Sequence, residues 1–182
     1  MILIRRSRTV PAIGAAIFLS SLLSGCVADG PQPPPRPEPR EVRIPAGLEV
    51  HKLVIAADQY PVDIDSNGYV DTFNVYVFLF PRPDKFDLPI FVDGTMKFEL
   101  LDDNERPVVE WVFSQDQVRQ ARTRPLPGPS HQFQLSLIDA AGTDRFRAAR
   151  TQLRVTFTPV DRDPVVANGR PTVTIGPTTD SR

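Results

Sequence analysis

The sequence is poor in the residues on which most enzymes and small secreted domains depend. Its 182 residues include one cysteine, Cys26, and two histidines, His51 and His131. A single cysteine excludes an internal disulfide framework, so the fold must be held by its own hydrophobic core. The two histidines belong to no zinc-ligand spacing and to no recognisable catalytic triad. We therefore expect that the protein is not an enzyme.

The chain also lacks a strong excess of charge of either sign. Lysine and arginine together number 21, against 22 aspartate and glutamate residues, which gives a formal net charge of −1. Nucleic acids and anionic lipid headgroups attract basic surfaces, so we expect neither as a partner. The length is that of one domain with tails.

The first 25 residues have the zones of an export signal. Arg5, Arg6 and Arg8 form a positively charged start, and residues 10–23 are almost wholly apolar or small. At roughly 1.5 Å per residue, this run is too short to cross the ~30 Å hydrocarbon core as a helix. The layout predicts a cleaved signal peptide over residues 1–25.

The apolar run ends in Leu23-Ser24-Gly25-Cys26, and this tetrapeptide resembles the lipobox of bacterial lipoproteins. In that family the cysteine thiol is joined to diacylglycerol, and the peptide bond before it is then cut. The resemblance implies that Cys26 is lipidated and that fatty acyl chains hold the mature protein on a membrane of the cell envelope. Val27 follows the cysteine, as in lipoproteins sent to the outer membrane of envelopes with two membranes.

Residues 26–40 are expected to form a lipidated linker. Within them, about every second residue of 29–40 is proline. Proline has no backbone N–H and favours the extended polyproline II conformation, so the segment suits a spacer between bilayer and domain. A ligand for a proline-binding groove is the alternative interpretation.

Beyond residue 41 the hydrophobic pattern favours strands. Residues 132–137 and 152–158 alternate strictly between polar and apolar side chains, which is the period of a sheet with one solvent-exposed face. Residues 96–101 and 108–113 are also typical of strands. Because a polar, turn-rich segment, 102–107, joins them, we predict a hairpin.

Two other segments, 49–57 and 73–80, are more continuously apolar, as in central strands that are covered on both faces. One short helix is predicted after Ser114, which has capping-box spacing with Gln117. Trp111 and most of the eleven phenylalanines are expected in the core.

These elements predict a single antiparallel β-sandwich over residues 41–160, with at most one short helix. Residues 161–182 are polar and broken up by proline and glycine. We expect them to form a tail, to which 171–175 adds at most one edge strand.

One segment, Asp63-Ile64-Asp65-Ser66-Asn67-Gly68-Tyr69-Val70-Asp71, has the pattern of a calcium loop. Oxygen-bearing side chains stand at its first, third, fifth and ninth positions, and glycine at the sixth permits a sharp bend. Ca²⁺ takes about six to eight oxygen ligands, and a chain coiled round the ion supplies them from alternate residues. The predicted ligands are Asp63, Asp65, Asn67, Asp71 and the backbone carbonyl of Tyr69.

The loop is not a complete EF-hand, because its twelfth position is Asn74 rather than Glu and a strand sequence follows it. It is more similar to the calcium loops of FG-GAP repeats in integrin-type propellers, in which the ninth-position aspartate is a ligand. The resemblance implies a structural calcium ion, but a single copy does not imply a propeller. The alternative is a polar turn, in which three neighbouring carboxylates would repel one another.

Together these features predict a membrane-anchored, non-enzymatic envelope lipoprotein whose β-sandwich meets another envelope component. The alternative is a carbohydrate- or peptide-binding module in the periplasm or on the cell surface, by analogy of fold. A row of exposed aromatic side chains on one sheet face would favour this alternative. A hydrolase would require His51 or His131 in a pocket beside a carboxylate.

Overall fold

The computed structural model describes residues 45–58, 61–124 and 128–178. The predicted signal peptide over 1–25, the lipidation residue Cys26 and the linker over 26–40 lie outside these ranges. Among the residues that are described, no helix has both the length and the apolar character needed to cross a membrane.

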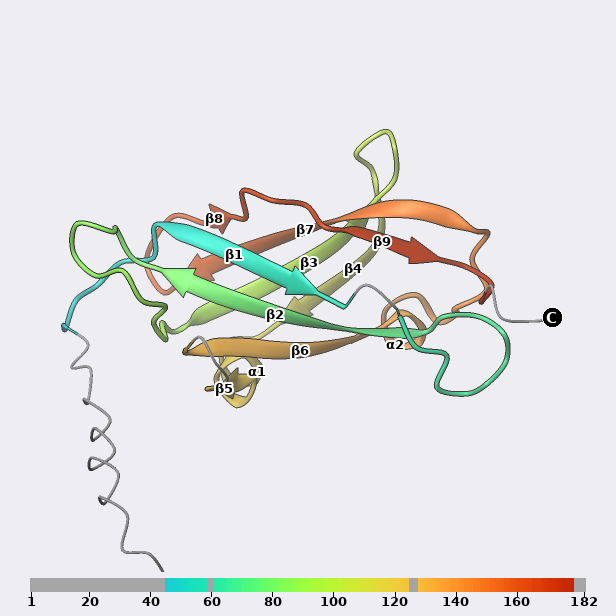
Figure 1. Ribbon diagram of the computed structural model, residues 1–182, viewed down its shortest axis with the longest axis horizontal. Coiled ribbons are helices and arrows are strands. Elements are labelled where there is room, and N and C mark those ends of the chain that lie inside the picture. Colours follow the sequence, from blue (N-terminus) through green and yellow to red (C-terminus); the bar gives the residue numbers. More distant parts are fainter. Residues whose placement is uncertain (1–44, 59–60, 125–127, 179–182) are drawn as a thin grey trace, which may run out of the picture. The chain divides into compact units, whose positions relative to one another are not determined.

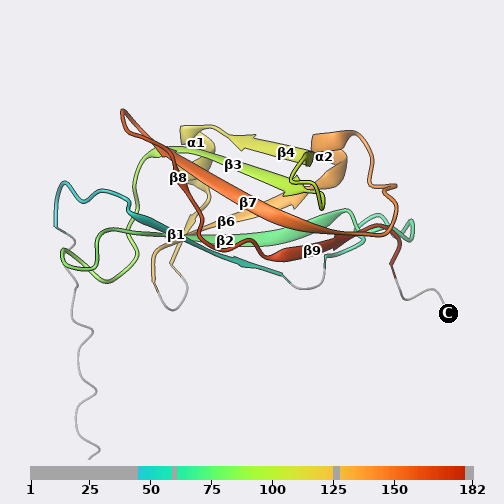
Figure 2. The same ribbon diagram turned by 90° about the horizontal axis from the view of Figure 1, so that it is seen from above.

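The described residues form two antiparallel sheets, as Figure 1 shows. The strands are β1 (Lys52–Ala57), β2 (Thr72–Phe80), β3 (Gly94–Leu101), β4 (Pro107–Phe113), β5 (Arg122–Thr123), β6 (Ser130–Ser136), β7 (Ala149–Pro159), β8 (Val165–Val166) and β9 (Thr172–Ile175). The first sheet has the order β1-β2-β6-β5, and the second has the order β4-β3-β7-β8, with β9 also paired to β7. In Figure 2, β1, β2 and β6 form one layer and β3, β4 and β7 form the other. The predicted β-sandwich is confirmed.

The core lies between the two sheets. Successive side chains of a strand point to opposite faces, so each strand sends alternate apolar residues inward. The indole N–H of Trp111 donates to the carbonyl of Ser136 at 2.8 Å, which satisfies its one polar atom in the core. Fully buried side chains of the central strands include Val75, Val77, Leu79, Phe98, Leu100, Leu153, Val155 and Phe157.

The predicted hairpin is confirmed, because β3 and β4 pair in register from Met96 opposite Phe113 to a bulge after Leu100.

The expectation that residues 49–57 form a central strand covered on both faces is wrong. β1 is an edge strand, and its outward Val54 is exposed. Burial on both faces is therefore not the reason for its apolar sequence.

The predicted helix is confirmed as α1 (Gln115–Gln120). The hydroxyl of Ser114 accepts a hydrogen bond from the Gln117 backbone at 3.4 Å, and the Gln117 side chain accepts one from the Ser114 backbone at 2.8 Å. These reciprocal bonds make the expected capping box and satisfy two donors at the helix start.

A second helix, α2 (Leu137–Ala141), corrects the expectation of at most one. The strand predicted to reach residue 137 ends at Ser136, whose hydroxyl accepts from the Asp139 backbone at 3.1 Å. Gly142 ends the helix with a φ of 71°, in the left-handed region that glycine adopts without strain.

The described residues of the predicted tail, 161–178, form two strands of the second sheet, where at most one was expected. Both β8 and β9 pair with β7, and β9 lies within the range 171–175. Val173 and Ile175 of β9 are buried in the core. The end of β9 thereby comes to lie beside the loop that leads into β2 (Figure 1).

Candidate metal site

The predicted calcium loop lies at one end of the sandwich, between α2 and the end of β9 (Figure 1). Backbone hydrogen bonds fix it to both neighbours. The N–H of Val70 donates to the carbonyl of Gly176 at 3.1 Å, and the N–H of Leu137 donates to the carbonyl of Asp71 at 2.7 Å. The loop, which leads into β2 of the first sheet, is thereby tied to α2 and to the end of β9 in the second sheet.

The first aspartate of the loop holds its turn. The Asp63 carboxylate accepts hydrogen bonds from the backbone N–H groups of Asn67 at 3.1 Å and Gly68 at 2.8 Å. Gly68 has a φ of 88°, a conformation that residues with a side chain rarely adopt. The glycine expected at the bend is thus required there by the backbone.

Three predicted ligands come together. Asp63, Asp65 and Asp71 each offer an oxygen, and these oxygens all lie within 4.8 Å of one another. Among the described residues, none of the three forms an ion pair with a basic side chain. Like charges at this separation repel, and the described part of the chain supplies no cation to offset the repulsion.

Asp71 is the most deeply placed of the three, with only 2% of its surface exposed. Its Oδ2 atom accepts from the backbone N–H of Ile64 at 2.7 Å and more weakly from that of Asp65 at 3.3 Å. Its Oδ1 atom is buried and has no hydrogen-bond partner in the described ranges. A buried, unpaired oxygen destabilises the fold, and a bound cation would remove that cost.

The other two predicted ligands differ from each other. Asn67 turns its amide nitrogen toward Asp65 at 3.0 Å, while its amide oxygen accepts from the Tyr69 backbone at 2.9 Å. It would have to rotate to present its oxygen to an ion. The carbonyl of Tyr69 faces no such obstacle, because the bonds of the β-bridge run from Val70 to Gly176 and from Thr178 to Gly68, so that Tyr69 and Pro177 form its non-hydrogen-bonded pair.

Sequence reasoning missed a fourth carboxylate, that of Asp144. Its Oδ2 atom accepts from the amide nitrogen of Asn67 at 2.7 Å across 77 positions of sequence, and only 4% of the residue is exposed. Asp144 follows α2 in a short connection to β7. No local sequence pattern marks Asp144 as a ligand, because it comes near the loop only through the pairing of β2 with β6.

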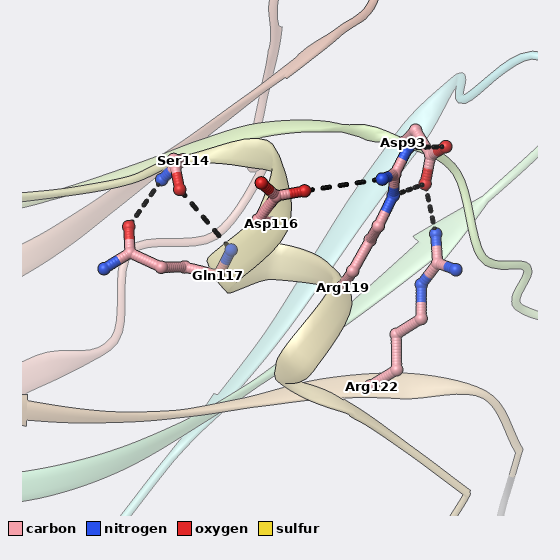
Figure 3. A network of polar contacts seen from close by, with 6 residues as sticks. All are labelled: Asp93, Ser114, Asp116, Gln117, Arg119 and Arg122. Atoms are coloured by element: carbon pink, nitrogen blue, oxygen red, sulfur yellow. Dashed lines mark hydrogen bonds and ion pairs between the residues drawn. The ribbon is translucent and has the colours of Figure 1, made fainter.

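Asp93 lies outside the loop, and unlike the loop aspartates it is paired with basic side chains, as Figure 3 shows. Its carboxylate accepts from Arg119 at 2.8 Å and from Arg122 at 2.6 Å. The hydrogen bond from Arg119 is the main cause that lowers the pKa of Asp93 to about 2. Arg119 also meets Asp116 at 3.4 Å, so the network ties α1 and β5 to the segment before β3.

The two histidines occupy different environments. His131 is wholly buried, its ring lies edge-on to Phe91 at 5.4 Å, and neither ring nitrogen has a hydrogen-bond partner within the described residues. Burial, and next the charge of Arg122, lower the pKa of His131 to about 4. This ring is therefore neutral at neutral pH. His51 is exposed and precedes β1.

The outward face of β2 carries a row of half-buried rings, Tyr76, Phe78 and Phe80, which we call the aromatic face. A groove of about 370 Å³ continues from it at Phe80. Its described lining contains no serine, threonine or cysteine that could serve as a nucleophile. The groove is lined by His51, Lys52, Val54, Phe80, Pro81, Pro83, Phe86 and Asp87.

Comparisons of the chain with protein-family models, with curated proteins and with solved structures found no match.

Proposed function

We propose that this protein is a lipid-anchored, non-enzymatic component of a bacterial cell envelope, whose β-sandwich binds a calcium ion in the loop 63–71. The lipid anchor rests on the resemblance of Leu23-Ser24-Gly25-Cys26 to a lipobox. The observation that supports the calcium site is the buried Oδ1 atom of Asp71, which has no hydrogen-bond partner among the described residues and lies in a cluster with Asp63 and Asp65.

The chemistry of the donors favours calcium over other metals. All the candidate ligands are carboxylate or carbonyl oxygens, which suit hard cations, and no histidine or cysteine stands among them to favour zinc or copper. Mg²⁺ demands near-octahedral geometry and retains water, whereas Ca²⁺ accepts a flexible cage of oxygens. A coiled loop such as 63–71 suits the larger ion.

The role that we assign to the ion is structural. Hydrogen bonds join the loop to Gly176 at the end of β9 and to Leu137 at the start of α2. An ion held in the loop would therefore stiffen the end of the sandwich at which the two sheets meet. A dissociation constant of ~10⁻⁴ to 10⁻³ M, typical of extracellular calcium modules, would suffice outside the cytoplasm.

The calcium proposal is tested by thermal unfolding in millimolar Ca²⁺ and in chelator. Free calcium at 100 times the dissociation constant stabilises the folded state by about 2.7 kcal/mol, which raises the melting temperature by several degrees. Asp71→Ala should abolish this increase. Asp103→Ala removes the same charge from an exposed turn and should retain it. An equal melting temperature of the unmodified protein in both solutions would contradict the proposal.

The lipid anchor is tested at Cys26. The unmodified protein should incorporate labelled fatty acid and sediment with membranes. Cys26→Ser lacks the thiol that is acylated, and it should lose the label and either become soluble or retain its signal. Equal labelling of the two proteins would show that Cys26 is not the lipidated residue.

A second candidate function, carbohydrate binding, is favoured by the aromatic face. Flat rings in a row, continued by a groove with polar groups from His51, Lys52 and Asp87, offer both stacking surfaces and hydrogen-bond partners for a sugar chain. Phe78→Ala should weaken binding to envelope oligosaccharides in a titration. Val112→Ala, on an exposed position of β4, is the matched control and should not. Tight binding of a peptide instead would redirect this candidate to peptide recognition.

A further inference from the structure

The loop 63–71 does not hold enough ligands for a calcium ion by itself. If each residue supplies one oxygen, Asp63, Asp65, Asp71, the Tyr69 carbonyl and a rotated Asn67 amide give five, while Ca²⁺ takes about six to eight. In a helical calcium loop the twelfth position provides a further carboxylate. Here that position is Asn74, and its amide donates to the carboxylate of Asp58 at 2.8 Å. A ligand must therefore come from elsewhere in the chain or from water.

Asp144 lies beside the cluster, outside the group of three aspartates whose oxygens are all within 4.8 Å of one another. Its carboxylate is buried beside the loop and accepts from the amide nitrogen of Asn67 at 2.7 Å. The same nitrogen donates to Asp65 at 3.0 Å. One amide group thus links two carboxylates. A cation at this point would attract both carboxylates more strongly than the neutral amide does.

We propose that Asp144 is a further ligand of the calcium ion, supplied from the connection between α2 and β7. The inference rests on the proposed calcium function, and the Oδ1 atom of Asp71, buried with no partner among the described residues, is the independent sign that an ion belongs there. Rotation of the Asn67 amide would release Asp65 and Asp144 and present the amide oxygen to the ion.

The consequence is a calcium clamp between the two sheets. Asp71 lies directly before β2 of the first sheet, and Asp144 lies a few residues before β7 of the second. An ion bound to both would hold these two strands together at one end of the sandwich. Removal of calcium should then loosen the connection between α2 and β7 as well as the loop itself.

The test is the calcium affinity of the full mature protein, measured by isothermal titration. Asp144→Asn keeps the size of the side chain and its ability to accept from Asn67, but removes the charge. It should weaken calcium binding at least about tenfold. Asp139→Asn removes the same charge from an exposed position of α2 and should change the affinity less than twofold. Melting in chelator should show that both variants fold.

The outcomes separate this inference from the proposed function. Equal affinities of Asp144→Asn and Asp139→Asn, with binding by the unmodified protein, would overturn the role of Asp144 alone. Absence of calcium binding by the unmodified protein would overturn both. Hydrogen exchange of the unmodified protein gives a second readout that needs no variant. Added calcium should protect amides of residues 143–148 together with those of 63–71, and protection of 63–71 alone would contradict the clamp.

Discussion

Glu99 on β3 and Asp71 before β2 are both buried carboxylates, but their surroundings differ. Glu99 is 5% exposed, and Arg154 donates to both of its oxygens, at 2.8 and 2.9 Å. Lys97 lies 3.1 Å from the same carboxylate. Asp71 meets only backbone N–H groups, and one of its oxygens meets no donor in the described ranges. At Glu99 the chain supplies its own cation, and at Asp71 we infer that the cation comes from solution.

His131 shows a third way to bury an ionisable group. It has neither a counter-charge nor a hydrogen-bond partner within the described residues, and burial is the main cause that lowers its pKa. The ring is kept neutral instead of being paired. Pairing and neutralisation are thus two means by which this fold accommodates ionisable groups in its interior, and metal binding at Asp71 is the third that we propose.

The largest effect is expected at His131, when the medium is acidified. Its pKa is about 4 in the folded protein and about 6.5 in the unfolded chain, so the unfolded state binds more protons between these values. The contribution of His131 is complete above pH 6.5 and is lost as the pH falls toward 4, with a total of about 3 kcal/mol. Urea unfolding across this range measures it. His131→Leu should flatten this part of the pH profile, and an unchanged profile would contradict neutral burial.

A smaller effect is expected when the pair at Glu99 is broken. Arg154→Met leaves Glu99 buried without its main partner, and should cost about 2 kcal/mol of unfolding free energy, with Lys97 as the remaining cation. Arg150→Met, at an exposed position of the same strand, is the control. The double variant Arg154→Met with Glu99→Gln should recover much of the loss, because no charge is left unpaired. A double variant as unstable as Arg154→Met would show that packing, not charge, is responsible.

The sequence was informative where the relevant residues are contiguous. The acidic loop could be predicted because Asp63, Asp65, Gly68 and Asp71 lie within nine positions, and their spacing is the pattern of a calcium loop with a glycine at its bend. Asp144 could not, because its proximity depends on the pairing of β2 with β6, which sets Thr72 opposite Ser136 and so brings the chain after α2 to the loop. The strands in which polar and apolar residues alternate strictly could also be predicted, because a period of two is visible within a few contiguous residues.

Two other features were misread, the apolar run over 73–80 and the helix α2. The apolar run over 73–80 suggested burial on both faces, whereas Tyr76, Phe78 and Phe80 form an outward row that is half-buried. The helix α2 was overlooked because five residues are too few to show a helical period. Its cap at Ser136 and its glycine at 142 were the only local signs.

The smallest effect is expected at Asp93, where the paired carboxylate is exposed to solvent. The hydrogen bond from Arg119, and with it Arg122, lowers the pKa of Asp93 to about 2, so the carboxylate contributes stability above its ordinary pKa that is lost as the pH falls toward 2. Water and salt weaken such a pair, and Asp93→Asn should therefore cost only about 0.5 kcal/mol at neutral pH. In 1 M NaCl this cost should largely disappear, whereas the cost of Arg154→Met should persist, because the pair at Glu99 is shielded from ions. Urea unfolding at both salt concentrations measures the difference. An equal response of the two pairs to salt would contradict the distinction between them.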